Sequence, residues 1–208
     1  MMLTVNNYTA GYARNQFLFQ EMSFELKPCE IIGITGTNGS GKSTFIKGLI
    51  NLTPFRKGTI CIDNDDVSQW DSSTIFRRKS IGYLSQRERV FSHLTVEENL
   101  RLYANYAKAD IILEDDLYQQ MQDIVQSKAK LPAANLSGGE QLILGLLCLT
   151  ILNPKIVLLD EPSDSLDTKF KELLIQILLH WKKSKSILMV EQNTEILELT
   201  TNKTLKIN

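Results

Sequence analysis

The residues with the clearest chemistry form a glycine-rich loop between an apolar cluster and a segment with helical spacing. Its eight residues satisfy the pattern G-x-x-x-x-G-K-[ST]. Glycines in such a loop let successive backbone N–H groups converge on phosphate oxygens, at the positive end of the following helix. We expect Lys42 to bridge the β- and γ-phosphates and Ser43 to bind Mg²⁺. The loop consists of Gly36, Thr37, Asn38, Gly39, Ser40, Gly41, Lys42 and Ser43.

The alternative interpretation of this loop is a chance glycine-rich turn. From average residue usage, a match somewhere in a chain of this length arises by accident on the order of one time in a hundred. The context lowers that chance further, because the loop follows a predicted strand and precedes a predicted helix. A phosphate-binding loop is therefore the favoured interpretation.

Two acidic residues, Asp160 and Glu161, follow the apolar run of residues 156–159. This placement predicts that Asp160 lies near the Mg²⁺ and that Glu161 polarises an attacking water molecule. Acidic residues at a strand end are often only a solvated terminus. A preceding phosphate loop in the same chain favours the catalytic interpretation.

A third polar segment precedes the apolar run of residues 142–152. Ser137 and Glu140 have the spacing of a capping box, so the segment could simply begin a helix. A plain cap does not need the two consecutive glycines, Gly138 and Gly139, which cost stability inside a first helical turn. They suggest a close approach of the backbone to a ligand.

The elements that must position these residues alternate along the chain. Short apolar clusters at 31–34, 81–84, 156–159 and 187–190 predict buried strands, and segments with helical spacing lie between them. This alternation predicts an α/β domain with a largely parallel sheet. Residues 88–134 show no strand pattern and predict an inserted helical subdomain, with a capping box at Thr95 and Glu98 and a second helix over residues 113–125.

Composition narrows the possible functions. The 208 residues carry 23 Lys and Arg against 24 Asp and Glu, so the chain has no excess of positive charge for general binding along a nucleic acid. The longest apolar stretch, at 142–152, has 11 residues, whereas crossing a bilayer takes roughly 20. No secretory signal pattern is visible at the N-terminus. Three separated cysteines predict reduced thiols in a cytoplasm.

The motifs and their order resemble the ATP-binding cassette, the nucleotide-binding subunit of ABC transporters, over essentially the whole chain. The resemblance implies a P-loop NTPase (RecA-like) core with an N-terminal antiparallel β subdomain and an inserted α-helical subdomain. Residues 1–87 and 155–208 would form the core with the β subdomain, and residues 88–154 the helical subdomain and the signature helix. The resemblance identifies residues 136–141 as the signature of the family. The implied activity is ATP binding and hydrolysis that powers separate membrane permease subunits, with ATP and Mg²⁺ bound.

The resemblance also assigns roles to single residues within the nucleotide site. Thr44 would contact the α-phosphate, and Gln86 would be the Q-loop residue that helps to hold the metal with Ser43 and Asp160. Tyr12 lies where the family places an aromatic residue that stacks on adenine. Tyr8 is close enough in sequence to compete, and an ordinary core tyrosine is the alternative role.

Partners follow from the same resemblance. Two cassettes of this family pack head to tail, so Ser137, Gly138 and Gly139 of one chain would close over the γ-phosphate held by the other. The partner cassette could be identical or different. Residues 90–106 resemble the surface that receives a permease, and residues 164–167 resemble the D-loop. The expected location is cytoplasmic, peripheral on the inner face of the cell membrane.

The main departure from the family pattern is Gln192, which stands where relatives usually carry a histidine. An amide still forms hydrogen bonds but does not titrate. Cassettes resembling the branched-chain amino-acid importers also carry Val-Glu-Gln-Asn here. We therefore expect hydrolysis that is retained or slower, with Glu161, Gln86, Gln192 and Lys42 as the catalytic set.

Two rival functions are considered. A soluble ABC ATPase acting on ribosomes or DNA usually has two cassettes in one chain or a long coiled-coil insertion, and this sequence shows neither. A weakly hydrolysing partner of a heterodimer would fit Gln192. The intact Glu161 and the signature segment argue against it.

Overall fold

The apolar clusters form a five-stranded parallel sheet, and four of its strands are those predicted from the sequence. In the order β10-β4-β9-β8-β7, every neighbouring pair is parallel. The structure is a computed structural model that describes residues 2–13, 16–108 and 115–207. The strands are β4 (Ile31–Gly36), β7 (Ile81–Leu84), β8 (Ile156–Asp160), β9 (Ser186–Val190) and β10 (Lys203–Ile207).

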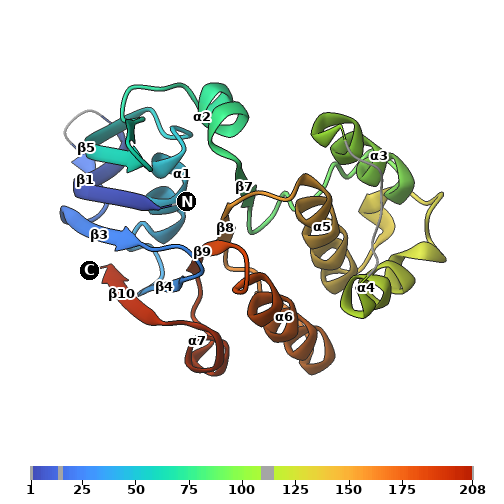
Figure 1. Cartoon of the computed structure of the whole chain (residues 1–208). Helices are drawn as coiled ribbons and strands as arrows, with labels where there is room; N and C mark the ends of the chain where they lie inside the picture. The colour runs from blue at the N-terminus through green and yellow to red at the C-terminus, as the bar shows by residue number, and fades with distance from the viewer. Residues whose placement is uncertain (1, 14–15, 109–114, 208) are drawn as a thin grey trace.

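A second sheet is antiparallel and is built mainly from the N-terminal third of the chain. Its longest strand, β1, pairs with β5 on one side and with β3 and β2 on the other. Figure 1 shows this sheet on the side of the parallel sheet away from α5. Its strands are β1 (Leu3–Ala13), β2 (Gln16–Phe17), β3 (Met22–Leu26), β5 (Phe55–Ile62) and β6 (Asp65–Asp66).

Four helices accompany the parallel sheet. The side chains of Asp71, Asp167 and Asn193 each accept a hydrogen bond from a backbone N–H in the first turn of the helix that follows. These N-caps satisfy donors that the helix itself leaves unpaired. The helices are α1 (Lys42–Leu49), α2 (Ser72–Lys79), α6 (Thr168–Trp181) and α7 (Thr194–Thr200).

The region between β7 and β8 is helical. It contains α3 (Val96–Ala107), α4 (Asp116–Gln126), a 3₁₀ turn at Ala133–Asn135 and α5 (Gly138–Leu152). Both predicted capping boxes are present, at the starts of α3 and α5. The second helix was expected over residues 113–125, of which 113 and 114 lie outside the described residues.

Helix α5 is the centre of the larger hydrophobic core. Helices α3 and α4 pack on it, and it is buried around almost its whole circumference from Leu142 to Leu149. In Figure 1 the three helices form one group beside the parallel sheet. Because every residue of α5 from Leu142 to Leu149 is buried, this part of its sequence needs no polar stripe.

The parallel strands divide the interior into two cores. Ile31, Val157 and Met189 belong to the core around α5, whereas their chain neighbours Ile32 and Leu158 belong to a core shared with α1 and the antiparallel sheet. Successive side chains of a strand point to opposite faces. Both faces of the sheet are therefore covered, and only the strand ends are left for polar chemistry.

One lysine is buried far from any of the predicted site residues. Lys185 precedes β9 and is 5% exposed, and its Nζ donates to the side-chain oxygen of Asn153 and, at 3.4 Å, to the carbonyl oxygen of Pro154. Burial, with a smaller contribution from Lys155, lowers the pKa of Lys185 to about 8. In an unfolded chain the pKa of lysine is about 10.4.

We predict that Lys185 makes stability rise with pH. Between its folded pKa of about 8 and the unfolded value near 10.4, the unfolded chain binds more protons than the folded chain, so the free energy of unfolding increases with pH. Urea unfolding at several pH values from 7 to 10 would compare the wild type with Lys185→Met. The free energy of unfolding of the wild type minus that of Lys185→Met should increase as the pH rises from 8 to 10. A value of this difference that does not change with pH would contradict the prediction.

Candidate active site

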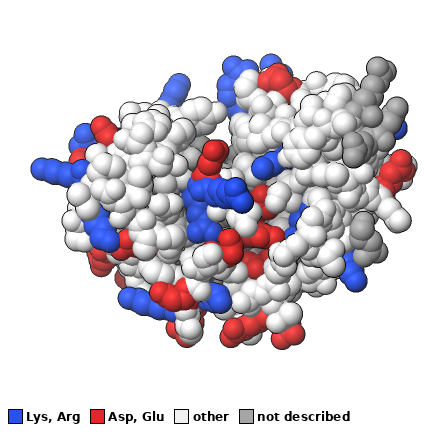
Figure 2. All heavy atoms as spheres, turned by 180° about the vertical axis from the view of Figure 1, so that it is seen from behind, with Lys and Arg blue, Asp and Glu red and all other residues white. Residues whose placement is uncertain are grey.

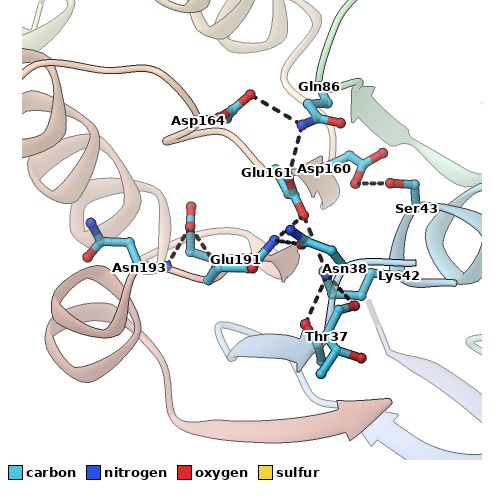
Figure 3. A network of polar contacts seen from close by, with 12 residues as sticks. Thr37, Asn38, Lys42, Ser43, Gln86, Asp160, Glu161, Asp164, Glu191 and Asn193 are labelled. Atoms are coloured by element: carbon cyan, nitrogen blue, oxygen red, sulfur yellow. Dashed lines mark hydrogen bonds and ion pairs between the residues drawn. The ribbon is translucent and has the colours of Figure 1, made fainter. Parts of the chain in front are cut away.

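The carboxyl ends of four neighbouring parallel strands meet at one edge of the sheet. The glycine-rich loop of residues 36–43 follows β4, Gln86 follows β7, Asp160 ends β8, and Gln192 follows β9. The register of the sheet places Asp160 beside Val190. Figure 3 shows side chains from these separate segments pointing toward one another.

Lys42 is enclosed by its own loop. It is 5% exposed, and its Nζ donates to the carbonyl oxygens of Gly36 at 3.0 Å and Thr37 at 3.1 Å. The same Nζ lies 3.7 Å from Oε1 of Glu161. Its acceptors in this state are thus two backbone carbonyls and one carboxylate.

The loop around Lys42 has the properties of an anion cradle. Gly39 and Gly41 have φ of 84° and 92°, in the left-handed region that favours glycine. A Cβ built at Gly39 would meet nothing within 4 Å, so the space above the backbone is open. The buried Oγ of Ser40 has no hydrogen-bond partner among the described residues. Gly41 caps α1 without a side-chain bond, which leaves first-turn N–H groups available to phosphate oxygens.

Ser43 and Asp160 form the part of the site suited to a divalent cation. The Oγ of Ser43 donates to Oδ1 of Asp160 at 3.0 Å. Asp160 is 2% exposed, and its burial raises the pKa of the carboxyl group, while the bond from Ser43 lowers it. Within the described chain no three His, Cys, Asp or Glu side chains gather as metal ligands. A hydroxyl and one carboxylate beside a phosphate site fit Mg²⁺, which keeps waters and phosphate oxygens as its other ligands.

Glu161 is held by amides on both carboxylate oxygens. Nε2 of Gln192 donates to Oε1 at 2.8 Å, and Nε2 of Gln86 donates to Oε2 at 2.9 Å. The backbone of Glu161 has φ of 47°, a left-handed conformation that costs a non-glycine residue on the order of 1–3 kcal/mol. Such strain persists only where the surroundings hold it, and it sets the direction of this side chain.

The turn that carries Gln192 is anchored by a buried carboxylate that the sequence analysis did not single out. Oε1 of Glu191 accepts the backbone N–H groups of Gln192 at 2.7 Å and Asn193 at 2.9 Å, and its Oε2 accepts that of Ser163 at 3.3 Å. Gln192 also donates to Oδ1 of Asn38 at 3.0 Å. The only sequence signal was an acid at the end of an apolar strand, the signal that had pointed to Asp160.

The two tyrosines that competed for the adenine position have different environments. Tyr8 is fully buried, donates to the carbonyl oxygen of Phe45 at 2.8 Å, and packs against the rings of Phe19 and Phe45. Tyr12 is 54% exposed and lines a cavity of about 760 Å³ together with Ser43, Gln86 and Asp160. Only Tyr12 has a ring face free for a base.

The signature residues lie apart from the phosphate loop of their own chain. Ser137 caps α5 and shares a capping box with Glu140, whose carboxylate also pairs with Lys128. Within the described residues no hydrogen bond joins 137–139 to 36–43. The structure therefore brings together Lys42, Ser43, Gln86, Asp160, Glu161 and Gln192, but not Ser137, Gly138 or Gly139.

The two signature glycines occupy their positions for different physical reasons. A Cβ at Gly138 would meet nothing within 4 Å, which fits the expected approach of a ligand to the backbone. A Cβ at Gly139 would collide with the ring of Phe170 in α6. Gly139 thus already has a packing reason within its own chain, which the sequence analysis did not foresee.

Charged groups of both signs line a depression of the surface, in addition to those at its periphery. Figure 2, seen from behind, shows Lys and Arg beside Asp and Glu in a hollow between two lobes that are mostly uncharged. Such a mixture of charges suits a ligand that carries both phosphate and a cation.

The sequence matches a known family over most of its length. The family described as "ABC transporter" matches residues 19–164. The chain belongs to the ABC transporter family. It is 32% identical to a probable branched-chain amino acid transport ATP-binding protein of Archaeoglobus fulgidus, covering 100% of this chain and 89% of the relative. It is also 32% identical to a high-affinity branched-chain amino acid transport ATP-binding protein of Pseudomonas aeruginosa, covering 92% of this chain and 82% of the relative.

Solved ABC cassettes have the same fold. A dimeric cassette bound to ADP and phosphate gives a TM-score of 0.82 at 23% identity, covering 99% of this chain and 94% of the other. An ATP-binding subunit of an ABC transporter gives 0.81 at 24% identity, covering 100% and 86%. The α/β P-loop NTPase fold predicted from the sequence is confirmed.

This ABC protein is an ATP-binding, ATP-hydrolysing subunit of the transporter class. Cassettes of its fold form dimers, and its relatives include proteins in which a cassette is joined to a permease. Among the described residues no helix combines the length and apolar character that crossing a membrane requires. The predictions of an ABC cassette and an ATPase are confirmed.

The contrast between the two signature glycines is testable. We predict that Gly139→Ala destabilises the fold by about 1–3 kcal/mol, because its methyl group overlaps the Phe170 ring. Gly138→Ala should be neutral or stabilising, since its methyl group enters open space and alanine favours a helix. Urea unfolding measures both effects. Adding Phe170→Ala should remove most of the Gly139→Ala penalty, whereas equal effects at both glycines would contradict the packing argument.

Proposed function

We propose that this chain binds MgATP at the edge of its parallel sheet and hydrolyses it as one half of a cassette dimer coupled to membrane permease subunits. The observation that carries the proposal is the convergence on Glu161 of Gln86, Gln192 and Lys42, each from a different strand end. The family supports ATP hydrolysis, and this cluster supports the assignment of roles to residues.

Lys42 and the backbone of its loop bind the triphosphate. In the state described, Lys42 is occupied by two carbonyls and by Glu161. Phosphate oxygens are stronger acceptors for an ammonium group than carbonyls are, so the triphosphate takes over these bonds and separates Lys42 from Glu161. The unpaired Ser40 hydroxyl and the open backbone at Gly39 supply further donors.

Ser43 and Asp160 would hold the Mg²⁺, with Gln86 as a third ligand. When bound, the cation supplies charge that stabilises the phosphoryl group during transfer. Thr44 is 5% exposed beside the loop and is assigned to the α-phosphate. Tyr12 supports the adenine ring from the exposed side of the cavity.

Glu161 is the general base for the attacking water. Two amides fix the direction of its carboxylate, and freed from Lys42 it accepts a proton from a water placed beside the γ-phosphate. Gln192 connects this base to Asn38 in the phosphate loop. It therefore performs by hydrogen bonding a positioning task that needs no charge.

The signature residues act on the nucleotide of a second cassette. Among the described residues no hydrogen bond joins them to the phosphate loop of their own chain, and the open backbone at Gly138 leaves room for a ligand. A second copy or a related cassette packed head to tail would supply that ligand. Hydrolysis then requires a dimer.

A groove between α3 and β7 is the proposed permease surface. It encloses about 570 Å³ and is lined by exposed apolar side chains, among them Phe91, Leu102 and Tyr106. We assign an apolar helix end of a membrane subunit to this groove, and the proposed location of the chain is therefore the inner face of the membrane. The specificity for the transported solute resides in the permease. Similarity to branched-chain amino-acid cassettes therefore supports the ATPase function and does not identify the transported solute.

We predict that Glu161→Gln abolishes turnover but retains ATP binding. Removal of a general base lowers kcat by about 10²–10⁴-fold, while the amide keeps the shape of the side chain. Phosphate release with Mg²⁺ measures turnover, and size-exclusion chromatography with ATP should show a trapped dimer. The exposed Glu172→Gln in α6 serves as the control and should resemble the wild type. Full turnover in Glu161→Gln would assign the base elsewhere.

We also predict that Gln192→Ala lowers kcat at least about tenfold at unchanged affinity for ATP, because Glu161 loses one of its two amide donors. Gln192→His restores a donor but adds a group with an ordinary pKa near 6.5. Its kcat should show an ionisation between pH 5.5 and 8 that the wild type lacks. Identical pH profiles and rates in all three proteins would remove Gln192 from the site.

A further inference from the structure

Arg89 is buried at the junction of three segments that are distant in the sequence. It follows Gln86 by three residues and is 8% exposed. Its Nη1 donates to the carbonyl oxygen of Gly138 at 3.1 Å, and its Nη2 donates to those of Pro162 at 3.3 Å and Asp164 at 3.4 Å. One guanidinium group therefore ties the signature turn to the turn that follows Glu161.

Burying the guanidinium group of Arg89 costs folding free energy, which argues that this residue does more than fill space. Burial lowers the pKa of Arg89, and the nearby Asp164 carboxylate opposes that shift. The buried Nε has no acceptor among the described residues. A buried polar donor without an acceptor costs about 1–3 kcal/mol, so an apolar residue would pack here more cheaply.

Helix α5 is shaped to receive the Arg89 segment. A Cβ at Gly145 would come within 3.0 Å of the Arg89 carbonyl oxygen and 2.7 Å of the Leu84 side chain. Glycine inside a helix costs about 1 kcal/mol relative to alanine. Gly145 thus allows the Arg89 segment to pack closely against α5, and it is a second, independent feature of the sequence that supports the same junction.

The two turns joined by Arg89 differ in their other supports. The turn after Glu161 is also held by Glu191, which accepts the Ser163 N–H, and by Gln86, which donates to Asp164. The polar supports of the signature turn other than Arg89, the Ser137–Glu140 capping box and Lys128, lie within the helical region. The ring of Phe170 in α6 also lies against Gly139, and this contact is apolar. Arg89 is therefore the polar link that sets the signature turn against the core.

We propose that Arg89 is a positioning residue that seats the signature turn on the core and so acts on the nucleotide site of the partner chain rather than on its own. The proposal rests on the proposed function, in which the signature completes the site of a second cassette. Arg89 touches neither nucleotide. Arg89 acts through its hydrogen bond to the carbonyl oxygen of Gly138, which fixes the position of the signature turn.

Mixed dimers separate the two sites. One chain carries Lys42→Met and a first affinity tag, so it supplies only its signature, while the other carries a second tag and an intact phosphate loop. Only one site then hydrolyses ATP. Arg89→Met in the chain that supplies the signature should lower kcat about tenfold or more, because small misplacements of a catalytic group are costly. The same change in the other chain should lower kcat less than about twofold.

Controls distinguish positioning from folding. Lys206→Met removes an exposed cation of β10, outside the proposed nucleotide and permease surfaces, and should leave kcat unchanged in either chain. Arg89→Lys keeps the cation and its stem but lacks the planar fork, so its loss should be intermediate. Arg89→Lys carries the test if Arg89→Met fails to fold, as judged by circular dichroism. Equal losses from both chains, or no loss from either, would overturn the proposal.

A second measurement needs neither a dimer nor turnover. In the isolated chain, hydrogen exchange of backbone amides at 137–141 should be faster in Arg89→Met than in the wild type, while the remainder of α5 and the affinity for ATP stay unchanged. Unchanged exchange at 137–141 would overturn the proposal. If a mixed dimer without any Arg89 change is inactive, the composite site of the proposed function fails. The exchange result then decides the role of Arg89 alone.

Discussion

The parallel register of β4, β9, β8 and β7 is the constraint on which the rest of this structure depends. Both faces of these strands are buried, so their polar neighbours in the sequence can lie only at the strand ends. Because the strands are parallel, those ends meet at one edge. Residues 36–43, 86, 160–161 and 192 become neighbours for this reason, although they are distant in the sequence.

The polar groups at this edge satisfy one another in the state described. Lys42 donates to two backbone carbonyls and lies beside the carboxylate of Glu161, which in turn accepts from Gln86 and Gln192. In the proposed mechanism Lys42 stays beside Glu161 until the triphosphate binds the lysine, which gives a physical reason for hydrolysis to follow nucleotide binding.

Helix α5 connects this edge to the helical region. Its apolar length forms the core with α3 and α4, and its first turn carries the signature. A helix buried on all sides moves as a body, since close-packed interiors deform little. The position of its first turn relative to Glu161 is then set by a few contacts at the junction, of which Arg89 and Phe170 are the main ones.

The sequence by itself determined the fold class, four strands of the parallel sheet, the capping boxes that begin α3 and α5, and the family, because these depend on local periodicity and on ordered motifs. It also named the residues that meet at the sheet edge. It placed Tyr12 at the adenine position without excluding Tyr8 or an ordinary core role, and burial separated the two tyrosines, which lie four residues apart in β1. Glu191 and Arg89 were missed because their importance lies in the backbone groups they hold, which no motif records. Gly139 acquired a packing reason only when α6 was placed beside α5. Contacts between segments far apart in the chain depend on how the layers pack, and that was decided by the tertiary structure.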